Sequence, residues 1–404
     1  MIEKACGIDV HRDLLVATIL SDQTKETKHF VNDANDIAKL KDWLKGHECK
    51  HAVMESTSVY WVPLYLALEE AGFDPILANA HQVKAIPGRK TDQSSSEWLA
   101  HLLRGGQIKP SYVPERRIRE VRELTRLRVK LVESRTAFKN RCQKILNRVN
   151  IRLGSRLSDV FGKAGREILE GLMAGKSVEA ILEHTQNRWL KNRCEEIKAV
   201  AKGALSENDI FVLKQLTETI EHLNEQIHRV EARIETIVNQ RDVEIVSSVP
   251  GVGRRSAAAI VAEIGDASRF SNGKQIAAWA GLAPSVYQSA GMFLTGSITK
   301  MGSKWLRRVM VEAAHSAVIV RDSRLRMFYL RVKDRKGAKT AIVAVARKML
   351  TVIWHLLVNG EMYVEEGFEK NVGKVRAVYA GHVPLEDMAV VLRSAGYMVT
   401  VPSG

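Results

Sequence analysis

The sequence lacks the cysteine patterns of disulfide-rich and zinc-binding proteins. Its four cysteines are far apart, and none belongs to a CxxC or Cys/His metal-ligand spacing; they stand at positions 6, 49, 142 and 194. The start, MIEKACGIDV, shows no cationic leader followed by an apolar core, and no stretch reaches the roughly 18 apolar residues that a membrane span needs. We therefore expect reduced, buried thiols in a soluble, cytoplasmic protein without a membrane partner.

Acidic residues are in the minority. Lys and Arg number 61 against 46 Asp and Glu, which gives a net charge of +15 and a pI near 9.6. Residues 104–156 contain 16 basic and 4 acidic side chains, so this stretch carries 16 − 4 = 12 of the 15 surplus charges. Such a concentrated excess favours a polyanionic partner, and we expect nucleic acid.

The length of 404 residues is enough for two or three domains, each with its own core. Alternating short apolar strands and helical stretches predict an α/β domain at residues 1–112. Strands are expected at 5–20, with a turn at 11–13, and at 29–32, 52–55 and 75–78, and helices at 36–45, 62–71 and 97–104. A basic helical region at 113–240, a C-terminal domain at 241–360 and a tail at 361–404 complete the predicted organisation.

Three acidic residues of the first domain form a candidate metal site. Asp9 lies within a β-branched run, Glu55 ends another apolar run, and Asp92 precedes the helix at 97–104. Carboxylates from two strands and a helix can converge at one sheet edge, where a divalent cation neutralises their mutual repulsion. We expect Mg²⁺, with Mn²⁺ as a substitute. Alternatively, each acid is an ordinary turn or edge residue.

Two amphipathic patterns dominate the middle of the chain. Residues 114–150 are helical and basic, and residues 213–237 carry a heptad seam with apolar positions alternately three and four apart. The seam predicts either a coiled coil that mediates assembly or a helix packed within its own domain. The candidate nucleic-acid ligands of the basic helix are Arg116, Arg117, Arg119, Arg122 and Arg126.

A third region begins at Val243, and its segment IVSSVPGVGRRSAAAIVAEIGD has the pattern of a helix-hairpin-helix: an apolar helix end, a turn at residues 250–253 and a new helix from Ser256. Its glycines allow a tight turn and leave backbone N–H groups at a helix start free to bind a phosphate; a plain connecting turn is the alternative. Candidate nucleic-acid ligands here and in the downstream GSITKMGSKWLRR are Gly251, Gly253, Lys300 and Lys304.

Taken together, these pieces resemble the DEDD transposases of bacterial insertion sequences, a family that includes bridge-RNA-guided recombinases and pilin-gene inverting recombinases. The resemblance covers about residues 4–355 and is carried by GIDVHRD, ESTSVYW, GRKTD followed by EWLAHLLR, VPGVGRRSA, and GLAPSVYQSAG with GSITKMGSKWLRR. It implies an α/β plus α fold: an N-terminal RuvC-like (ribonuclease H) domain, a helical or coiled-coil insertion, and a mainly α C-terminal domain that supplies a serine.

The family's functional residues map onto this sequence with one departure. Asp9, Glu55 and Asp92 match the first three acids, but Ser95 stands where the family has its fourth. Glu97 lies roughly 140 degrees further round a helix from Asp92 and is a poor substitute. The family's serine corresponds to Ser289, and the resemblance implies a covalent phosphoserine intermediate.

The resemblance favours a bacterial transposase that cuts and rejoins DNA with Mg²⁺ and a serine nucleophile, working with a guide RNA as a homo-oligomer, either dimer or tetramer. A site-specific DNA invertase of the same family is an alternative. Two further classes stay open: a catalytically impaired nucleic-acid-binding homologue, marked by Ser95, and a RuvC-like junction nuclease that uses metal alone.

Overall fold

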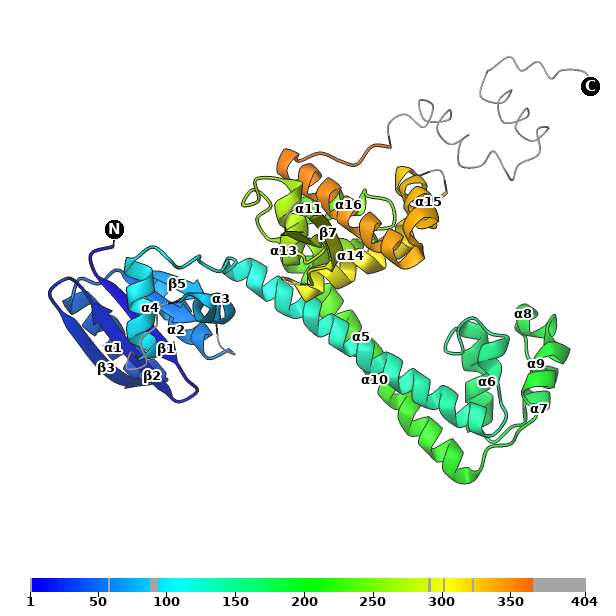
Figure 1. The fold of residues 1–404 in the computed structure, drawn as a ribbon. Coiled ribbons are helices and arrows are strands. Elements are labelled where there is room, and N and C mark those ends of the chain that lie inside the picture. Colours follow the sequence, from blue (N-terminus) through cyan, green and yellow to red (C-terminus); the bar gives the residue numbers. More distant parts are fainter. Residues whose placement is uncertain are drawn as a thin grey trace, which may run out of the picture. The chain divides into compact units, whose positions relative to one another are not determined.

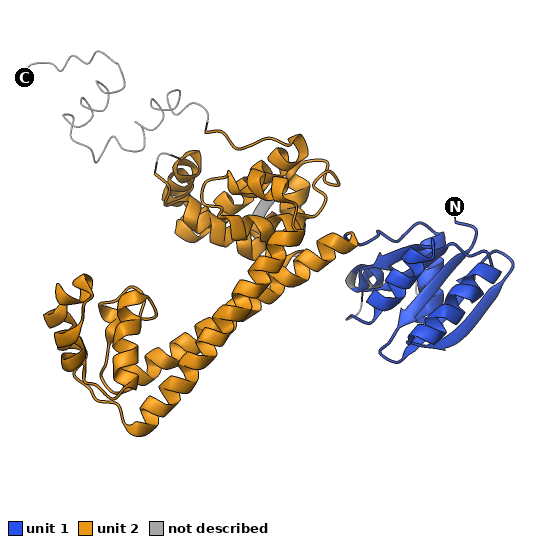
Figure 2. Ribbon diagram, turned by 180° about the vertical axis from the view of Figure 1, so that it is seen from behind, with its two compact units in different colours: residues 1–114 blue, residues 115–404 orange. Residues whose placement is uncertain are grey.

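The computed structural model of the chain describes residues 2–56, 59–87, 94–289, 292–300, 302–321 and 323–365. The chain divides into two compact units, residues 1–114 and 115–404 (Figures 1 and 2). The helical region and the C-terminal domain expected from the sequence both belong to the second unit. Most of the expected tail lies outside the described residues.

Unit 1 is built on a mixed five-stranded sheet in the order β3-β2-β1-β4-β5. The first three strands form an antiparallel meander, and β4 and β5 run parallel to β1. This arrangement is consistent with the expected ribonuclease H type. The strands are β1 (Ala5–Val10), β2 (Leu14–Leu20), β3 (Lys25–Val31), β4 (His51–Glu55) and β5 (Asp74–Ala78).

Helices cover both faces of this sheet. Successive side chains of a strand point to opposite faces, and apolar side chains on each face form a core with the helices that cover it. On one face, α1 (Ala34–Gly46) and α2 (Trp61–Glu70) pack against Cys6, Ile8 and Met54. On the other face, Ala5 and Val53 contribute to a smaller core with α3 (Ala80–Ala85) and α4 (Ser95–Arg104). The sequence pattern predicts the other helices of this unit but not α3, which has only six residues.

Unit 2 begins with a long antiparallel pairing of α5 (Arg116–Arg148) and α10 (Glu207–Ile237). The heptad seam of α10 faces α5 and the small helices near the far end of the pair, so the partner of the seam lies in the same chain. Its buried members are seven residues apart: Leu213, Ile220, Ile227 and Ile234. This is the alternative interpretation of the seam, packing within its own domain.

Between α5 and α10 the chain forms a small separate core. Its elements are η1 (Leu153–Ser155), α6 (Lys163–Met173), α7 (Val178–His184), α8 (Arg188–Lys191) and α9 (Cys194–Val200). Their apolar side chains pack with Cys142 and Leu146 of α5 and with Leu213 and Ile220 of α10. The outer end of the helical pair is thereby fixed by its own hydrophobic cluster.

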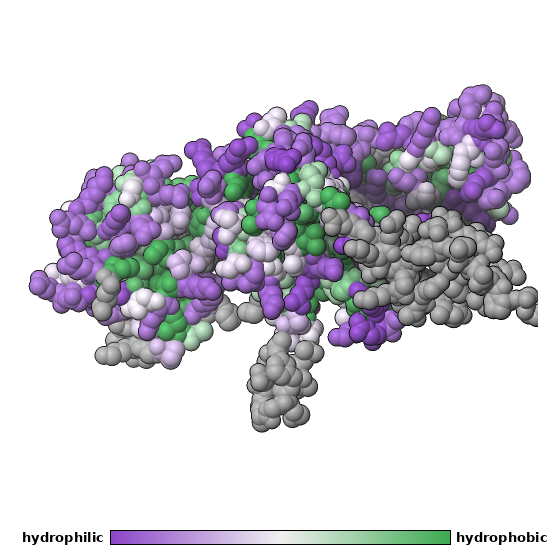
Figure 3. Space-filling view, turned by 90° about the horizontal axis from the view of Figure 1, so that it is seen from above, coloured by the Kyte–Doolittle hydropathy of each residue, from purple (hydrophilic) through white to green (hydrophobic). Residues whose placement is uncertain are grey.

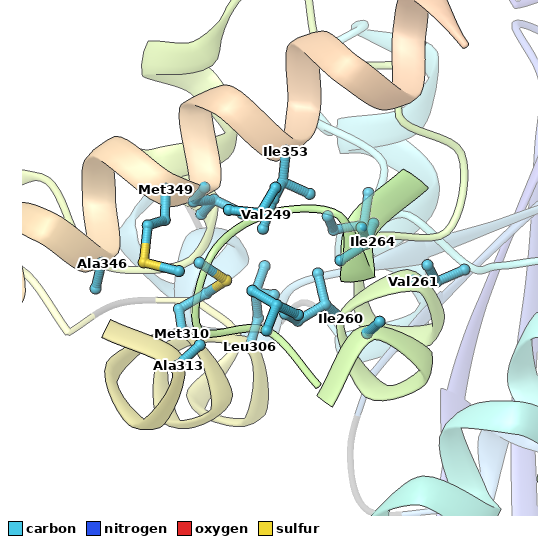
Figure 4. Close-up of a cluster of buried hydrophobic side chains, with 14 of the residues drawn as sticks. Val249, Ile260, Val261, Ile264, Leu306, Met310, Ala313, Ala346, Met349 and Ile353 are labelled. Atoms are coloured by element: carbon cyan, nitrogen blue, oxygen red, sulfur yellow. The ribbon is translucent and has the colours of Figure 1, made fainter. Parts of the chain in front are cut away.

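The C-terminal part of unit 2 packs around α16 (Ala338–Asn359). Ile260 of α12 (Arg254–Ile264) and Leu306 and Met310 of α14 (Lys304–Ala317) converge on Met349 and Ile353 of α16 (Figure 4). The remaining elements are α11 (Gln240–Ser247), α12 (Arg254–Ile264), α13 (Gly273–Trp279), β6 (Pro284–Ser289), β7 (Met292–Ile298), α14 (Lys304–Ala317) and α15 (Arg324–Lys336).

Helix α16 is long and apolar enough to cross a membrane by length and composition alone, contrary to the expectation that no stretch is. Eight of its side chains are buried in the C-terminal core, and a core helix passes the same test, so this is weak support for a span. In the space-filling view, hydrophilic residues dominate the visible face and apolar residues form smaller patches between them (Figure 3).

The cysteines are free thiols: Cys6, Cys49 and Cys142 are buried, and Cys194 is half-buried. Burial raises the pKa of Cys6 well above its ordinary value, since the thiolate would lose its hydration. It also raises the pKa of Cys49 and of Cys142 to about 11. These three thiols are therefore protonated and poorly reactive at neutral pH.

Candidate active site and nucleic-acid interface

Asp9 and Glu55 are neighbours at the carboxyl ends of two adjacent parallel strands. In the register of β1 with β4, Ile8 pairs with Met54, so the next residues along each strand are Asp9 and Glu55. Ile8 and Met54 point into the core beneath α1 and α2. Because side chains alternate along a strand, both carboxylates project to the opposite face, which α4 covers.

Helix α4 packs directly on the backbone of β1 at Gly7, two residues before Asp9. A Cβ at Gly7 would lie 2.0 Å from the carbonyl oxygen of Ser96 and 2.5 Å from the amide nitrogen of Ala100. The Ser96 hydroxyl is also buried, 2.8 Å from the hydroxyl of Thr18 on β2. Glycine is required for this close approach, a role that no pattern within GIDVHRD indicates.

The first turn of α4 contains the position that departs from the family pattern. Ser94 caps the helix by accepting a hydrogen bond from the backbone N–H of Glu97. Ser95 is the first helical residue and is half-buried. The Glu97 carboxylate lies 2.6 Å from Nζ of Lys25 on β3, so this acid has a cationic partner within its own unit. Asp92 lies outside the described residues.

The two described carboxylates suit a divalent cation. The side chain of Asp9 is 28% exposed, and its Oδ2 lies 3.4 Å from Nε2 of His11, a residue predicted from the sequence only as part of a turn. Carboxylate oxygens are the ligands that Mg²⁺ prefers. No three His, Cys, Asp or Glu side chains gather as a metal site among the described residues, and the third predicted ligand, Asp92, is not among them.

Ser289 is the last residue of β6, in an antiparallel hairpin with β7. It pairs with Met292, so two residues connect the strands. Nearer the base of the hairpin, the hydroxyl of Ser285 donates a 2.9 Å hydrogen bond to the carbonyl of Ser297. The backbone thus places Ser289 at the tip of a hairpin, while its side chain lies outside the described atoms.

Comparison with known proteins identifies the family. Residues 6–151 match the DEDD_Tnp_IS110 family model, described as "Transposase", and residues 243–330 match the "Transposase IS116/IS110/IS902 family" model. The first match includes Asp9, Glu55 and Asp92, and the second includes Ser289. The chain belongs to the IS110 family of DEDD transposases. It is an enzyme of the DNA transposase and recombinase class.

Two curated relatives illustrate similarity over most of the relative's length. The pilin gene-inverting protein of Moraxella bovis is 22% identical over 367 residues, which is 87% of this chain and 94% of the relative. The transposase for insertion sequence element IS1111A of Coxiella burnetii is 22% identical over 294 residues, or 71% of this chain and 72% of the relative.

Two arginines predicted to bind nucleic acid are engaged inside the transposase. Nε and Nη2 of Arg126 donate to the two carboxylate oxygens of Glu263 at 2.7 and 3.0 Å. The side chain of Glu263 is only 4% exposed, and its Oε2 also accepts a hydrogen bond from Ser303. Arg122 donates to the backbone carbonyls of Ala262 and Glu263. A phosphate contact by either arginine would compete with these bonds.

Acidic partners compensate further cations of α5. Arg128 lies 2.7 Å from the carboxylate of Glu231 on α10, and Arg148 pairs with Asp209 on the same helix. Glu133 of α5 accepts hydrogen bonds from Lys130 and from Arg308 of α14, which lower the pKa of Glu133 to about 2. The charge excess of residues 104–156 is therefore partly neutralised by helices distant in sequence.

The remaining predicted ligands of α5 lie at its beginning. Arg116 pairs with Glu120 one turn later. Nε of Arg117 donates to the carbonyl of Ile237 at 2.8 Å, which ties the start of α5 to the end of α10. Arg119 is half-buried. Nucleic-acid binding by these three side chains stays a prediction.

The two predicted glycines differ in their surroundings. Gly251 has φ +84, and a Cβ there would lie 2.3 Å from the backbone nitrogen of Ala317, so this turn packs tightly on the end of α14. Gly253 is the N-cap of α12 and has no atom within 4 Å of a Cβ position. The structure therefore explains Gly251 by packing, whereas space is open beside Gly253.

The two predicted lysines flank the start of α14. Lys300 is exposed and has φ +55, and its carbonyl accepts a 3.0 Å hydrogen bond from Arg307. Lys304 is the first residue of α14, and its Nζ lies 5.6 Å from the ring centroid of Trp305. Their ammonium groups remain candidates for phosphate binding.

Proposed function

We propose that this transposase cuts and rejoins DNA strands at a Mg²⁺ site formed by Asp9, Glu55 and Asp92, with Ser289 as nucleophile. The observation that carries the metal site is the adjacency of Asp9 and Glu55 on one face of the sheet. Mg²⁺, when bound, polarises the scissile phosphate and stabilises the leaving oxygen. The match of both family models supports the combination of acids with a serine.

The proposed chemistry is a transesterification that needs no oxidant or co-reactant. A bond forms between Oγ of Ser289 and phosphorus as the bond from phosphorus to one sugar oxygen breaks. The serine proton leaves to a base or to solvent, and the released sugar oxygen takes up a proton. In rejoining, a sugar hydroxyl attacks the phosphoserine and restores Ser289, so the phosphoester energy is conserved.

A guide RNA and a homo-oligomer belong to this proposal because the family resemblance implies them. The pilin gene-inverting relative, aligned over 94% of its length, favours site-specific DNA inversion as the second candidate function. The two share the same strand chemistry. The DNA around the reading frame distinguishes them, since a mobile element has its own termini and an inversion system has one invertible segment.

The metal site is tested by strand cleavage with Mg²⁺ titration. Asp9→Ala and Glu55→Ala each abolish cleavage but leave nucleic-acid binding nearly unchanged, because the lost ligand misplaces the metal without altering the basic surface. Asp42→Ala and Glu70→Ala remove exposed carboxylates of the same unit and serve as controls. Cleavage retained by Asp9→Ala contradicts the proposal.

The nucleophile is tested by trapping the protein on DNA. Ser289→Ala binds nucleic acid normally and gives no covalent adduct, whereas Ser285→Ala still forms it, because that hydroxyl is bonded across the base of the hairpin. Cleavage by the wild type without any adduct points instead to a nuclease that uses metal alone. Neither cleavage nor adduct points to a binding protein without catalysis.

A further inference from the structure

An open groove lies between helices α15 and α16 and the base of the β6–β7 hairpin. Its volume is about 1040 Å³. The residues that α16 contributes, between Lys339 and Val352, are alternately one and three positions apart, which is one face of the helix over about 20 Å. We call it the α15–α16 groove. Its size is at the upper end of the roughly 300–1,000 Å³ of small-molecule sites, and its length suits a polymer.

Lysine and arginine side chains line the groove, and its lining includes no Asp or Glu. Residues 324–348 contain nine Lys and Arg and one acid, Asp334, which does not line the groove. In the part of the chain that the structure describes, no ion pair involves the cations of the lining, unlike the compensated arginines of α5. These cations are Arg335, Lys336, Lys339, Arg347 and Lys348.

Apolar side chains and one aromatic ring complete the lining. Phe328 is half-buried, and Nζ of Lys348 lies 5.0 Å from its ring centroid. The other apolar members are Leu282, Pro284, Ile298, Val332, Val343, Ala344 and Val352. An apolar floor with an aromatic ring suits unpaired bases, because a duplex presents its phosphates and sugars outward and keeps its base faces stacked.

We propose that the α15–α16 groove binds a single-stranded segment of nucleic acid, with phosphates on its cations and bases against Phe328 and the apolar floor. The proposal rests on the proposed function, since it names a strand-binding surface of the same enzyme. Pro284 lines the groove and lies five residues before Ser289 on β6, about 17 Å along the strand. The groove thus holds a strand at the base of the hairpin whose tip carries Ser289.

The test measures binding of a fluorescent oligothymidylate, and of a duplex of equal length, to the full chain without metal and in a Ser289→Ala background. The triple variant Lys339→Gln, Arg347→Gln and Lys348→Gln weakens single-strand binding and lowers the slope of log affinity against log salt by about 0.7 for each lost phosphate contact, about 2 in total. A matched triple at exposed lysines outside the groove removes the same charge and leaves the slope unchanged: Lys176→Gln, Lys202→Gln and Lys214→Gln.

A second variant tests the floor of the groove while the charge is kept. Phe328→Leu preserves apolar packing but removes the ring, so single-strand affinity falls about fivefold or more and duplex affinity does not change. Equal losses in both triple variants, equal losses for single strand and duplex, or equal competition by polyglutamate would each overturn the proposal. Because binding is read without metal or the serine, these results are independent of whether Ser289 forms an adduct.

Discussion

Gly7→Ala tests the contact that brings α4 onto the face of Asp9. The new Cβ would lie 2.0 Å from the Ser96 carbonyl oxygen, and real Cβ contacts essentially never fall below 3.0 Å, so α4 has to move by about 1 Å. Overpacking of this kind costs about 1–3 kcal/mol of unfolding free energy. A displacement of about 1 Å near reacting groups can lower the rate by about a hundredfold.

The measurements are amide hydrogen exchange of β1 and α4 in the full-length chain and strand cleavage at saturating Mg²⁺. Gly46→Ala is the matched control, because it lies in α1 of the same unit and has no atom within 4 Å of a Cβ position. That control is neutral or stabilises by up to about 1 kcal/mol. If Gly7→Ala exchanges and cleaves like the wild type, the packing of α4 on β1 does not position the acidic site.

Three further predictions concern other contacts. In denaturant titrations, Arg126→Ala lowers the free energy of unfolding by about 2–3 kcal/mol. This is less than the roughly 3–5 kcal/mol lost when a fully buried pair is broken, because Arg126 is 39% exposed. Adding Glu263→Gln recovers part of the loss, since no unpaired carboxylate then stays buried. Ser95→Asp lowers the Mg²⁺ concentration needed for cleavage, because it adds a carboxylate to the metal site. The control Ser94→Asp keeps the helix cap and does not change this concentration. An inert Ser95→Asp would show that a fourth carboxylate is dispensable. The pKa of Glu133 is lowered from 4.5 to about 2, so its contribution to the free energy of unfolding is present above about pH 4.5 and is lost as the pH falls toward 2. In Glu133→Gln the free energy of unfolding therefore depends less on pH within that window.

Local sequence patterns were sufficient to locate most elements of unit 1. The β-branched run around Asp9 and the apolar run ending at Glu55 form adjacent strands, as expected from the α/β pattern. Period and propensity act over a few residues, so they identify strands without an alignment. Alternation along β1 sets the face on which Asp9 projects. The helix that covers this face, α4, is held there by its close contact at Gly7, between residues about 90 positions apart.

The basic stretch shows what a short window of sequence leaves out. Its charge surplus predicted a nucleic-acid surface, but the acids that pair with Arg126 and Arg128 lie on α12 and α10, more than 100 residues later. The heptad spacing likewise predicts which side chains of α10 are buried but not which helix covers them, and this helix is mainly α5. Ser289 could not be selected by pattern at all, because a serine in a loop-like segment has no periodicity or spacing that marks it as a nucleophile.

The antiparallel pair of α5 and α10 also has a mechanical consequence. Val121 and Ile234 belong to the C-terminal core, while Leu146 and Leu213 belong to the small core at the other end. Val121 and Leu146 are 25 residues apart on one helix, a span of about 38 Å. Ion pairs cross-link the two helices. If the pair tilted as one rigid rod by about 5° at one core, the other core would be displaced by about 3 Å over this span.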